Sequence, residues 1–102
     1  KHTIITGPRA IGKTWISKAI INQHSQNDVI QLTRIDKITL AGLLLQTNIK
    51  LLVVDQCNEE DILKCLEMMG KKNLRILFIT QDKINNKDFP NSHIINLHNY
   101  EL

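Results

Sequence analysis

Short apolar runs alternate along the chain with stretches in which apolar residues recur at helical spacing. Five runs rich in aliphatic and β-branched residues predict β-strands, at residues 3–6, 28–33, 50–55, 74–80 and 94–97. Residues 51–54 read LLVV and are apolar at every position. Such continuous apolarity is typical of a strand that is buried on both faces, as in a parallel sheet.

Three helices are predicted between these strands, at residues 13–24, 36–47 and 58–70. The third is the best marked, because Asn58 is suited to cap it, acidic residues fill its first turn, and Gly70 is suited to end it. Asp36 is the predicted cap of the second helix. The inner faces are expected to hold Trp15, Ile16, Ala19 and Ile20; Ile38, Ala41, Leu44 and Leu45; and Ile62, Leu63, Leu66 and Met69.

The order of these elements predicts an α/β fold. Strands that alternate with helices are joined by right-handed crossovers, which give a parallel sheet with helices on both faces, a three-layer sandwich. Residues 81–93 are polar and predict a loop with at most one helical turn. The length of 102 residues predicts a single domain, residues 1–102.

Composition excludes several classes of protein. A hydrophobic fraction of 42% and a charged fraction of 23% are close to those of globular proteins, unlike those of disordered chains or coiled coils. No apolar run approaches the roughly 18 residues that a membrane helix needs. The net charge of +3 is spread along the chain and gives little support for nucleic-acid binding.

The two cysteines, Cys57 and Cys65, fit neither a disulfide framework nor a zinc spacing. We therefore expect reduced, buried thiols and a cytoplasmic location. No signal peptide is visible, and the abrupt start leaves open that the sequence is a fragment of a longer protein.

Residues 7–14 read GPRAIGKT and fit the pattern G-x-x-x-x-G-K-[ST] between a predicted strand and a predicted helix. Glycines allow a tight loop whose backbone N–H groups face phosphate oxygens, and the start of the helix adds its positive dipole end. Lys13 would bridge the β- and γ-phosphates, and the Thr14 hydroxyl would bind Mg²⁺. The Trp15 N–H would face the α-phosphate, with the ring packed in the core. The predicted nucleotide-binding residues are Gly7, Pro8, Arg9, Ala10, Ile11, Gly12, Lys13, Thr14 and Trp15.

A carboxylate ends the most apolar strand, since Asp55 follows the LLVV run. The carboxyl edge of a parallel sheet is where ligands of α/β proteins bind, and the 7–14 motif lies at the same edge. We expect Asp55 to hold the water shell of Mg²⁺ beside Thr14. The predicted metal-binding residues are Thr14 and Asp55.

Three segments together resemble the P-loop NTPases, within the additional-strand division that includes AAA+ and STAND ATPases. TGPRAIGKT is similar to their Walker A motif, LLVVDQC to Walker B, and ILFITQ to the strand that carries the sensor-1 residue. The resemblance covers nearly the whole chain. It implies a five-stranded parallel sheet in the order 5-1-4-3-2 and the ligands ATP and Mg²⁺. It also implies that Gln81 or Thr80 contacts the γ-phosphate or the attacking water.

The chain departs from this family directly after Asp55. The family usually has a glutamate there, whereas this chain has Gln56, which can orient a water molecule but cannot accept its proton. Glu59 and Glu60 follow closely, but they are better suited to the first turn of a helix. The lid with its sensor-2 arginine has no counterpart, and only six residues precede Gly7, so the adenine pocket is incomplete. The predicted catalytic residues are Lys13, Gln56 and Gln81.

The leading hypothesis is a minimal ATPase core that binds a nucleoside triphosphate, with ATP expected, and hydrolyses it slowly by attack of water on the γ-phosphate. Gln56 favours one alternative, a non-hydrolytic nucleotide-binding switch or assembly module. A small-molecule or nucleoside kinase is a second, although residues 81–93 carry no phosphate-clamping arginine. The core of a phage or plasmid DNA-linked ATPase or helicase is a third. A homo-oligomer, a protein partner and nucleic acid remain open as partners beside the nucleotide.

Overall fold

The computed structural model describes residues 2–8, 12–33, 37–45, 48–69 and 71–98. Its α-helices and strands alternate, with two short 3₁₀ turns between them. The elements are β1 (His2–Thr6), α1 (Lys13–Ile21), η1 (Gln26–Asp28), β2 (Val29–Leu32), α2 (Lys37–Leu44), β3 (Leu51–Val54), α3 (Glu59–Met69), β4 (Arg75–Thr80), η2 (Asn86–Asp88) and β5 (Ser92–Asn96).

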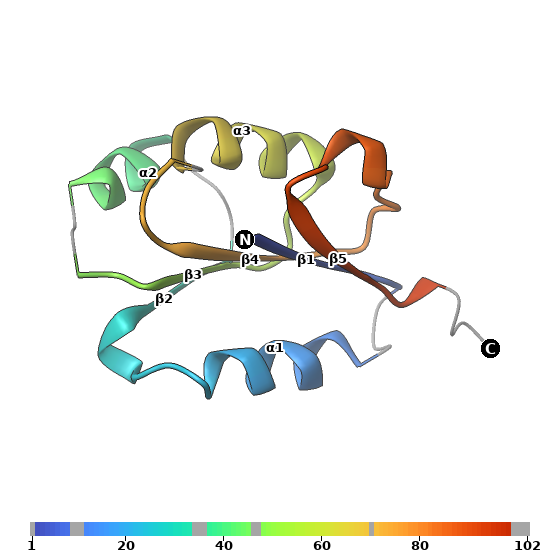
Figure 1. Ribbon diagram of the computed structural model, residues 1–102, viewed down its shortest axis with the longest axis horizontal. Coiled ribbons are helices and arrows are strands. Elements are labelled where there is room, and N and C mark those ends of the chain that lie inside the picture. Colours follow the sequence, from blue (N-terminus) through green and yellow to red (C-terminus); the bar gives the residue numbers. More distant parts are fainter. Residues whose placement is uncertain (1, 9–11, 34–36, 46–47, 70, 99–102) are drawn as a thin grey trace.

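The five strands form one parallel sheet in the order β2-β3-β4-β1-β5, which confirms the predicted strand order. Helix α1 covers one face of this sheet, and α2 and α3 cover the other, so the α/β class and the three layers are confirmed (Figure 1). Strand β1 lies between β4 and β5, with Thr6 opposite Thr80. The segment that leaves β1 therefore starts beside the segment that leaves β4.

Successive residues of the central strands belong to different sides of the core. Leu52 and Val54 pack on the α2–α3 side, whereas Leu51 and Val53 pack on the α1 side. Side chains of a strand point alternately to its two faces, and both faces of this sheet are covered by helices. This arrangement explains why the sequence is apolar at every position of β3.

The two sides of the core differ in size. Among the described residues, the α2–α3 side contains 14 buried residues and the α1 side contains six. A single helix covers the α1 side, so part of that face is left open next to the carboxyl ends of β2 and β3. The candidate functional site lies in this opening.

Helix α1 contacts the sheet through a different stripe from the predicted one. Ile20 is buried, and Ile16 and Ile21 pack against the same cluster. The prediction that Trp15 packs in the core is wrong, because its side chain is 84% exposed, and Ala19 is also exposed. The buried stripe is shifted by one position, to residues 16, 17, 20 and 21. Spacing alone does not reveal which edge of an apolar stripe meets the sheet.

Helices α2 and α3 show similar shifts. In α2 the buried side chains include Leu40 and Leu43, whereas Leu45, predicted to face inward, is 84% exposed. In α3 Ile62 and Met69 are buried as predicted, but Leu63 is 46% exposed. Ala41 is exposed as well. Asp36, predicted to cap α2, and Gly70, predicted to end α3, lie outside the described residues.

The predicted cap of α3 is confirmed. Asn58 Oδ1 accepts a hydrogen bond from Asp61 N at 2.8 Å, and Asn58 N donates to Asp61 Oδ2 at 3.2 Å. This reciprocal pair satisfies two N–H groups that the helix itself leaves without a partner. Three acidic residues in the first turn, Glu59, Glu60 and Asp61, suit the positive end of the helix dipole.

The last strand begins earlier than predicted. Strand β5 starts at Ser92, two residues before the predicted Ile94, because it pairs with β1 from His2 onward. The polar segment before it contains only the single turn η2, as expected. Of the helices that the structure describes, none has the length and apolarity needed to cross a membrane.

Candidate functional site

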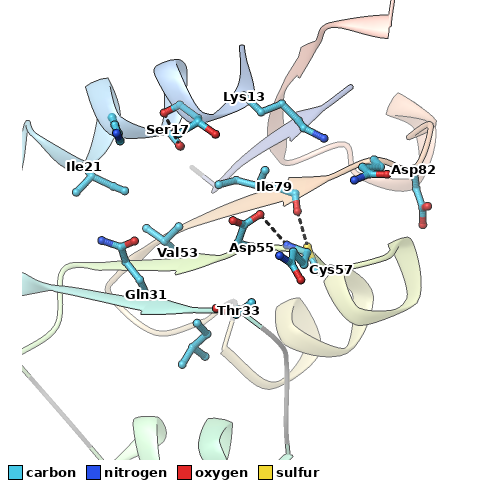
Figure 2. A pocket seen from close by; sticks show the side chains of 15 residues that line it. Lys13, Ser17, Ile21, Gln31, Thr33, Val53, Asp55, Cys57, Ile79 and Asp82 are labelled. Atoms are coloured by element: carbon cyan, nitrogen blue, oxygen red, sulfur yellow. Dashed lines mark hydrogen bonds between the residues drawn. The ribbon is translucent and has the colours of Figure 1, made fainter. Parts of the chain in front are cut away.

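A cleft of about 500 Å³ opens at the carboxyl edge of the sheet, between α1 and the ends of β2, β3 and β4 (Figure 2). Its volume is within the range of small-molecule sites, roughly 300–1,000 Å³. Figure 2 shows Lys13 on the helix side of this cleft and Asp55 on the sheet side. The lining residues are Lys13, Thr14, Ser17, Lys18, Ile21, Gln31, Leu32, Thr33, Val53, Asp55, Gln56, Cys57, Ile79, Gln81 and Asp82.

The N-terminus of α1 has no acidic residue in its first turn and no side-chain cap. Gly12 occupies the cap position with a φ of 88°, a left-handed conformation that residues other than glycine rarely adopt. A methyl group at this position would meet no atom within 4 Å, so there is room for a side chain. Glycine is favoured there by the backbone angle alone. Unlike α3, this helix presents its positive end without a carboxylate of its own, an arrangement that suits a bound anion.

Lys13 folds back over the start of the segment that leaves β1. Its Nζ donates a hydrogen bond to Gly7 O at 2.7 Å. Gly7 N in turn donates to Thr80 O at 3.2 Å, which joins the ends of β1 and β4. The ammonium group is therefore held near the point where β1 and β4 end.

The turn that follows β3 is constrained. Asp55 is exposed, and its Oδ1 accepts a hydrogen bond from Gln56 N at 2.8 Å. Gln56 has a φ of 54°, in the left-handed region, which costs about 1–2 kcal/mol for a residue with a side chain. Such conformations concentrate at functional sites. The strained Gln56 lies directly beside Asp55, the predicted metal ligand. It occupies the position at which the resembled family usually has a glutamate.

Cys57 lines the inner wall of the cleft but is itself 5% exposed. Its Sγ lies within hydrogen-bond distance of Ile79 O and Val54 O, at 3.4 and 3.6 Å, and its one hydrogen is donated to or shared between these two acceptors. Burial raises the pKa of this thiol from 9.0 to about 12. The sulfur is therefore protonated at neutral pH, and it serves as a packing group and not as a nucleophile.

The structure distinguishes the two candidates at the end of β4. Thr80 is 1% exposed, and its Oγ1 accepts a hydrogen bond from Asp82 N at 3.1 Å. Gln81 is exposed and lines the cleft. Gln81 is thus the side chain available to a ligand.

Asp82 is a cleft residue that sequence reasoning missed. Its Oδ2 accepts a hydrogen bond from Glu59 N at 3.0 Å, and its backbone oxygen accepts one from the Thr6 hydroxyl. Because that hydroxyl has a single hydrogen, His98 Nε2, at 2.9 Å from Thr6 Oγ1, acts as the donor to it. Asp55 was found as a polar residue directly after a buried strand. Asp82 is the second residue after β4, so the same pattern extended by one position would have found it, and the pattern as it stands would have found Thr33 directly after β2.

The cleft brings together five of the predicted site residues, namely Lys13, Thr14, Asp55, Gln56 and Gln81. Gly7 joins them through its bond to Lys13. Pro8, Gly12 and Trp15 do not line the cleft. Arg9, Ala10 and Ile11 lie outside the described residues.

The two glutamates weighed as catalytic bases, Glu59 and Glu60, do not line the cleft either. Glu60 pairs with Lys64 at 3.6 Å on the exposed face of α3. Their position agrees with the alternative interpretation, charge at the helix N-terminus. Within the described part of the chain, no group of three or more His, Cys, Asp or Glu side chains could hold a metal ion.

Comparison of the chain with protein-family models, with curated proteins and with solved structures gave no match.

Proposed function

We propose that this protein binds a nucleoside triphosphate, with ATP expected, together with Mg²⁺ in the cleft between α1 and the sheet. We further propose that it is a P-loop NTPase domain of AAA-like core topology. The strand order β2-β3-β4-β1-β5 and the G-x-x-x-x-G-K-[ST] pattern between β1 and α1 support this assignment.

The observation that carries the proposal is the position of Lys13. Its ammonium group is held 2.7 Å from Gly7 O, in the same cleft as Thr14 and Asp55. A cation and a hydroxyl from the 7–14 motif and a carboxylate from the end of β3 thus line one cleft. A glycine-bearing turn that merely joined a strand to a helix would not require this arrangement.

Each group has a specific role toward Mg-ATP. Lys13 would donate charge-assisted hydrogen bonds to the β- and γ-phosphates, and the N-terminus of α1, with no acidic residue in its first turn, would add its positive dipole end. Thr14 and Asp55 would hold the magnesium ion. Mg²⁺ usually takes one or two carboxylates and completes its shell with phosphate oxygens and water, so a single aspartate fits it. The ion would neutralise negative charge on the phosphates.

The test is calorimetric titration of the protein with ATP, ADP, GTP and GDP in the presence of Mg²⁺. We expect ATP binding in the wild type and an affinity about 10- to 100-fold weaker in Lys13→Ala, since a hydrogen bond to a charged group contributes about 1.5–3 kcal/mol. Omission of Mg²⁺ should also weaken the binding of ATP.

Lys64→Ala is the matched control, because it removes a lysine from the exposed face of α3, outside the cleft. Its affinity for ATP should equal that of the wild type. Undiminished binding in Lys13→Ala would show that the 7–14 motif does not bind the phosphates. An absence of binding in the wild type would refute the proposed function.

A further inference from the structure

The cleft contains a carboxylate that the proposed function leaves without a role. Asp55 and Asp82 are the two acidic residues in its described lining, and Asp55 is assigned to the metal. Gln56 and Gln81 carry neutral amides, which cannot accept a proton at neutral pH. We infer that Asp82 is the catalytic base that activates the attacking water, in place of the residue after Asp55. The inference rests on the proposed function.

Asp82 is attached to the candidate phosphate site through the backbone. Its backbone oxygen accepts the hydroxyl of Thr6, a residue that is fully buried and directly precedes Gly7. Gly7 O in turn holds the Lys13 ammonium. The backbone of Asp82 is therefore connected, through Thr6 and Gly7, to the cation proposed to bind the γ-phosphate, at the ends of β1 and β4.

The orientation of the Asp82 side chain is also set. Its Oδ2 accepts a hydrogen bond from Glu59 N at the start of α3, and its backbone nitrogen donates to Thr80 Oγ1 at 3.1 Å. Oδ1 is the oxygen that we assign to the water molecule. The residue is exposed, so solvent reaches it. A base held by its neighbours in this way needs little reorganisation when the reaction occurs.

The step that follows is an in-line hydrolysis. The water oxygen forms a bond to the γ-phosphorus, and the bond between that phosphorus and the bridging oxygen of the β-phosphate breaks, with its electron pair staying on the bridging oxygen. One proton of the water passes to Asp82 Oδ1 and is then released to solvent. The products are the nucleoside diphosphate and inorganic phosphate, while Gln56 and Gln81 orient the water through their amides.

The principal test is Asp82→Asn, because an asparagine oxygen can still accept the hydrogen bond from Glu59 N. We expect the steady-state rate of phosphate release from Mg-ATP to fall about 100-fold, the effect typical of a lost general base, while ATP affinity by calorimetry stays within about threefold. Asp82→Glu should retain a measurable part of the rate. Asp88→Asn, which changes an aspartate in η2 that does not line the cleft, is the matched control and should behave as the wild type.

A second variant distinguishes the loss of a catalytic base from a structural effect of the substitution. Adding Gln56→Glu to Asp82→Asn provides a carboxylate elsewhere in the same cleft. We expect this double variant to release phosphate at least tenfold faster than Asp82→Asn. An equal loss of affinity and rate in Asp82→Asn, without this recovery, would show that Asp82 only shapes the cleft and would overturn the inference.

Two other results also overturn it. They are an unchanged rate in Asp82→Asn and an absence of hydrolysis in a wild type that binds ATP. In both cases the proposed nucleotide binding would stand, and the second result would favour a non-hydrolytic switch. Failure of the wild type to bind ATP would instead refute the proposed function and this inference with it.

Discussion

Cys65 lies in the α2–α3 side of the core, with 0% of its side chain exposed. Burial raises the pKa of its thiol from 9.0 to about 12, since an isolated thiolate is poorly solvated there. The folded protein therefore holds this proton more tightly than the unfolded chain does. The stabilisation that results is fully present below pH 9 and is lost as the pH rises toward 12.

The difference in the pKa of Cys65 between the folded and the unfolded protein predicts how the stability of Cys65→Ala compares with that of the wild type at alkaline pH. Between pH 9 and 12 the wild type should lose up to about 1.4 kcal/mol per pH unit more than the variant in its free energy of unfolding. Urea denaturation at a series of pH values measures it. Groups that titrate in both proteins, lysines above all, cancel in the comparison. Parallel pH profiles for the two proteins would contradict the buried, neutral thiol.

At the level of elements, α1 and α3 begin at the same edge of the sheet with opposite chemistry. Helix α3 has a side-chain cap and three acidic residues in its first turn, whereas α1 has a left-handed glycine and no acidic residue there. The first arrangement completes a helix within the protein. The second leaves N–H groups for an external anion, so α1 and not α3 is the helix suited to bind one.

The cap of α3 carries a prediction about stability. Asn58→Ala should lower the free energy of unfolding by about 1 kcal/mol, because Asp61 N would lose its acceptor at 2.8 Å. Asn58→Asp keeps an acceptor oxygen and should stay close to the wild type. Asn73→Ala, at an exposed position outside the helices and strands, is the control in urea denaturation. A loss of equal size in the control would show that the cap contributes nothing specific.

At the level of the whole molecule, the two sides of the core share the strands of one sheet. Leu51 and Leu52 are neighbours in β3, both almost fully buried, and they pack on opposite sides. A substitution that destabilises either side should therefore destabilise the other through the shared sheet, and the protein should unfold in a single transition.

Replacing these leucines one at a time tests this. Leu51→Ala and Leu52→Ala should each lower the free energy of unfolding by about 2–5 kcal/mol, within a single transition followed by circular dichroism. Leu63→Ala, at a position that is 46% exposed, should cost less than either. Separate transitions in one variant, or an undiminished stability in Leu51→Ala, would show that the α1 side is not part of the same cooperative unit.

The sequence by itself determined the α/β class, the presence of five strands, the cap at Asn58 and the expectation that Lys13 and Asp55 lie at the same edge of the sheet. The strand order followed from the family resemblance. These features depend on local spacing and residue type, which repeat in recognisable patterns along the chain. The structure confirmed the parallel sheet and showed that five predicted residues line one cleft.

Only the tertiary structure decided which edge of each apolar stripe is buried. It exposed Trp15 and Leu63, because helix orientation depends on the shape of the surface beneath the helix, and it exposed Leu45, because α2 ends at Leu44. It also brought Asp82 beside Thr6 and Glu59, residues 76 and 23 positions away. Contacts between the ends of adjacent strands depend on how the chain crosses the sheet, and such distant pairings leave no local pattern in the sequence.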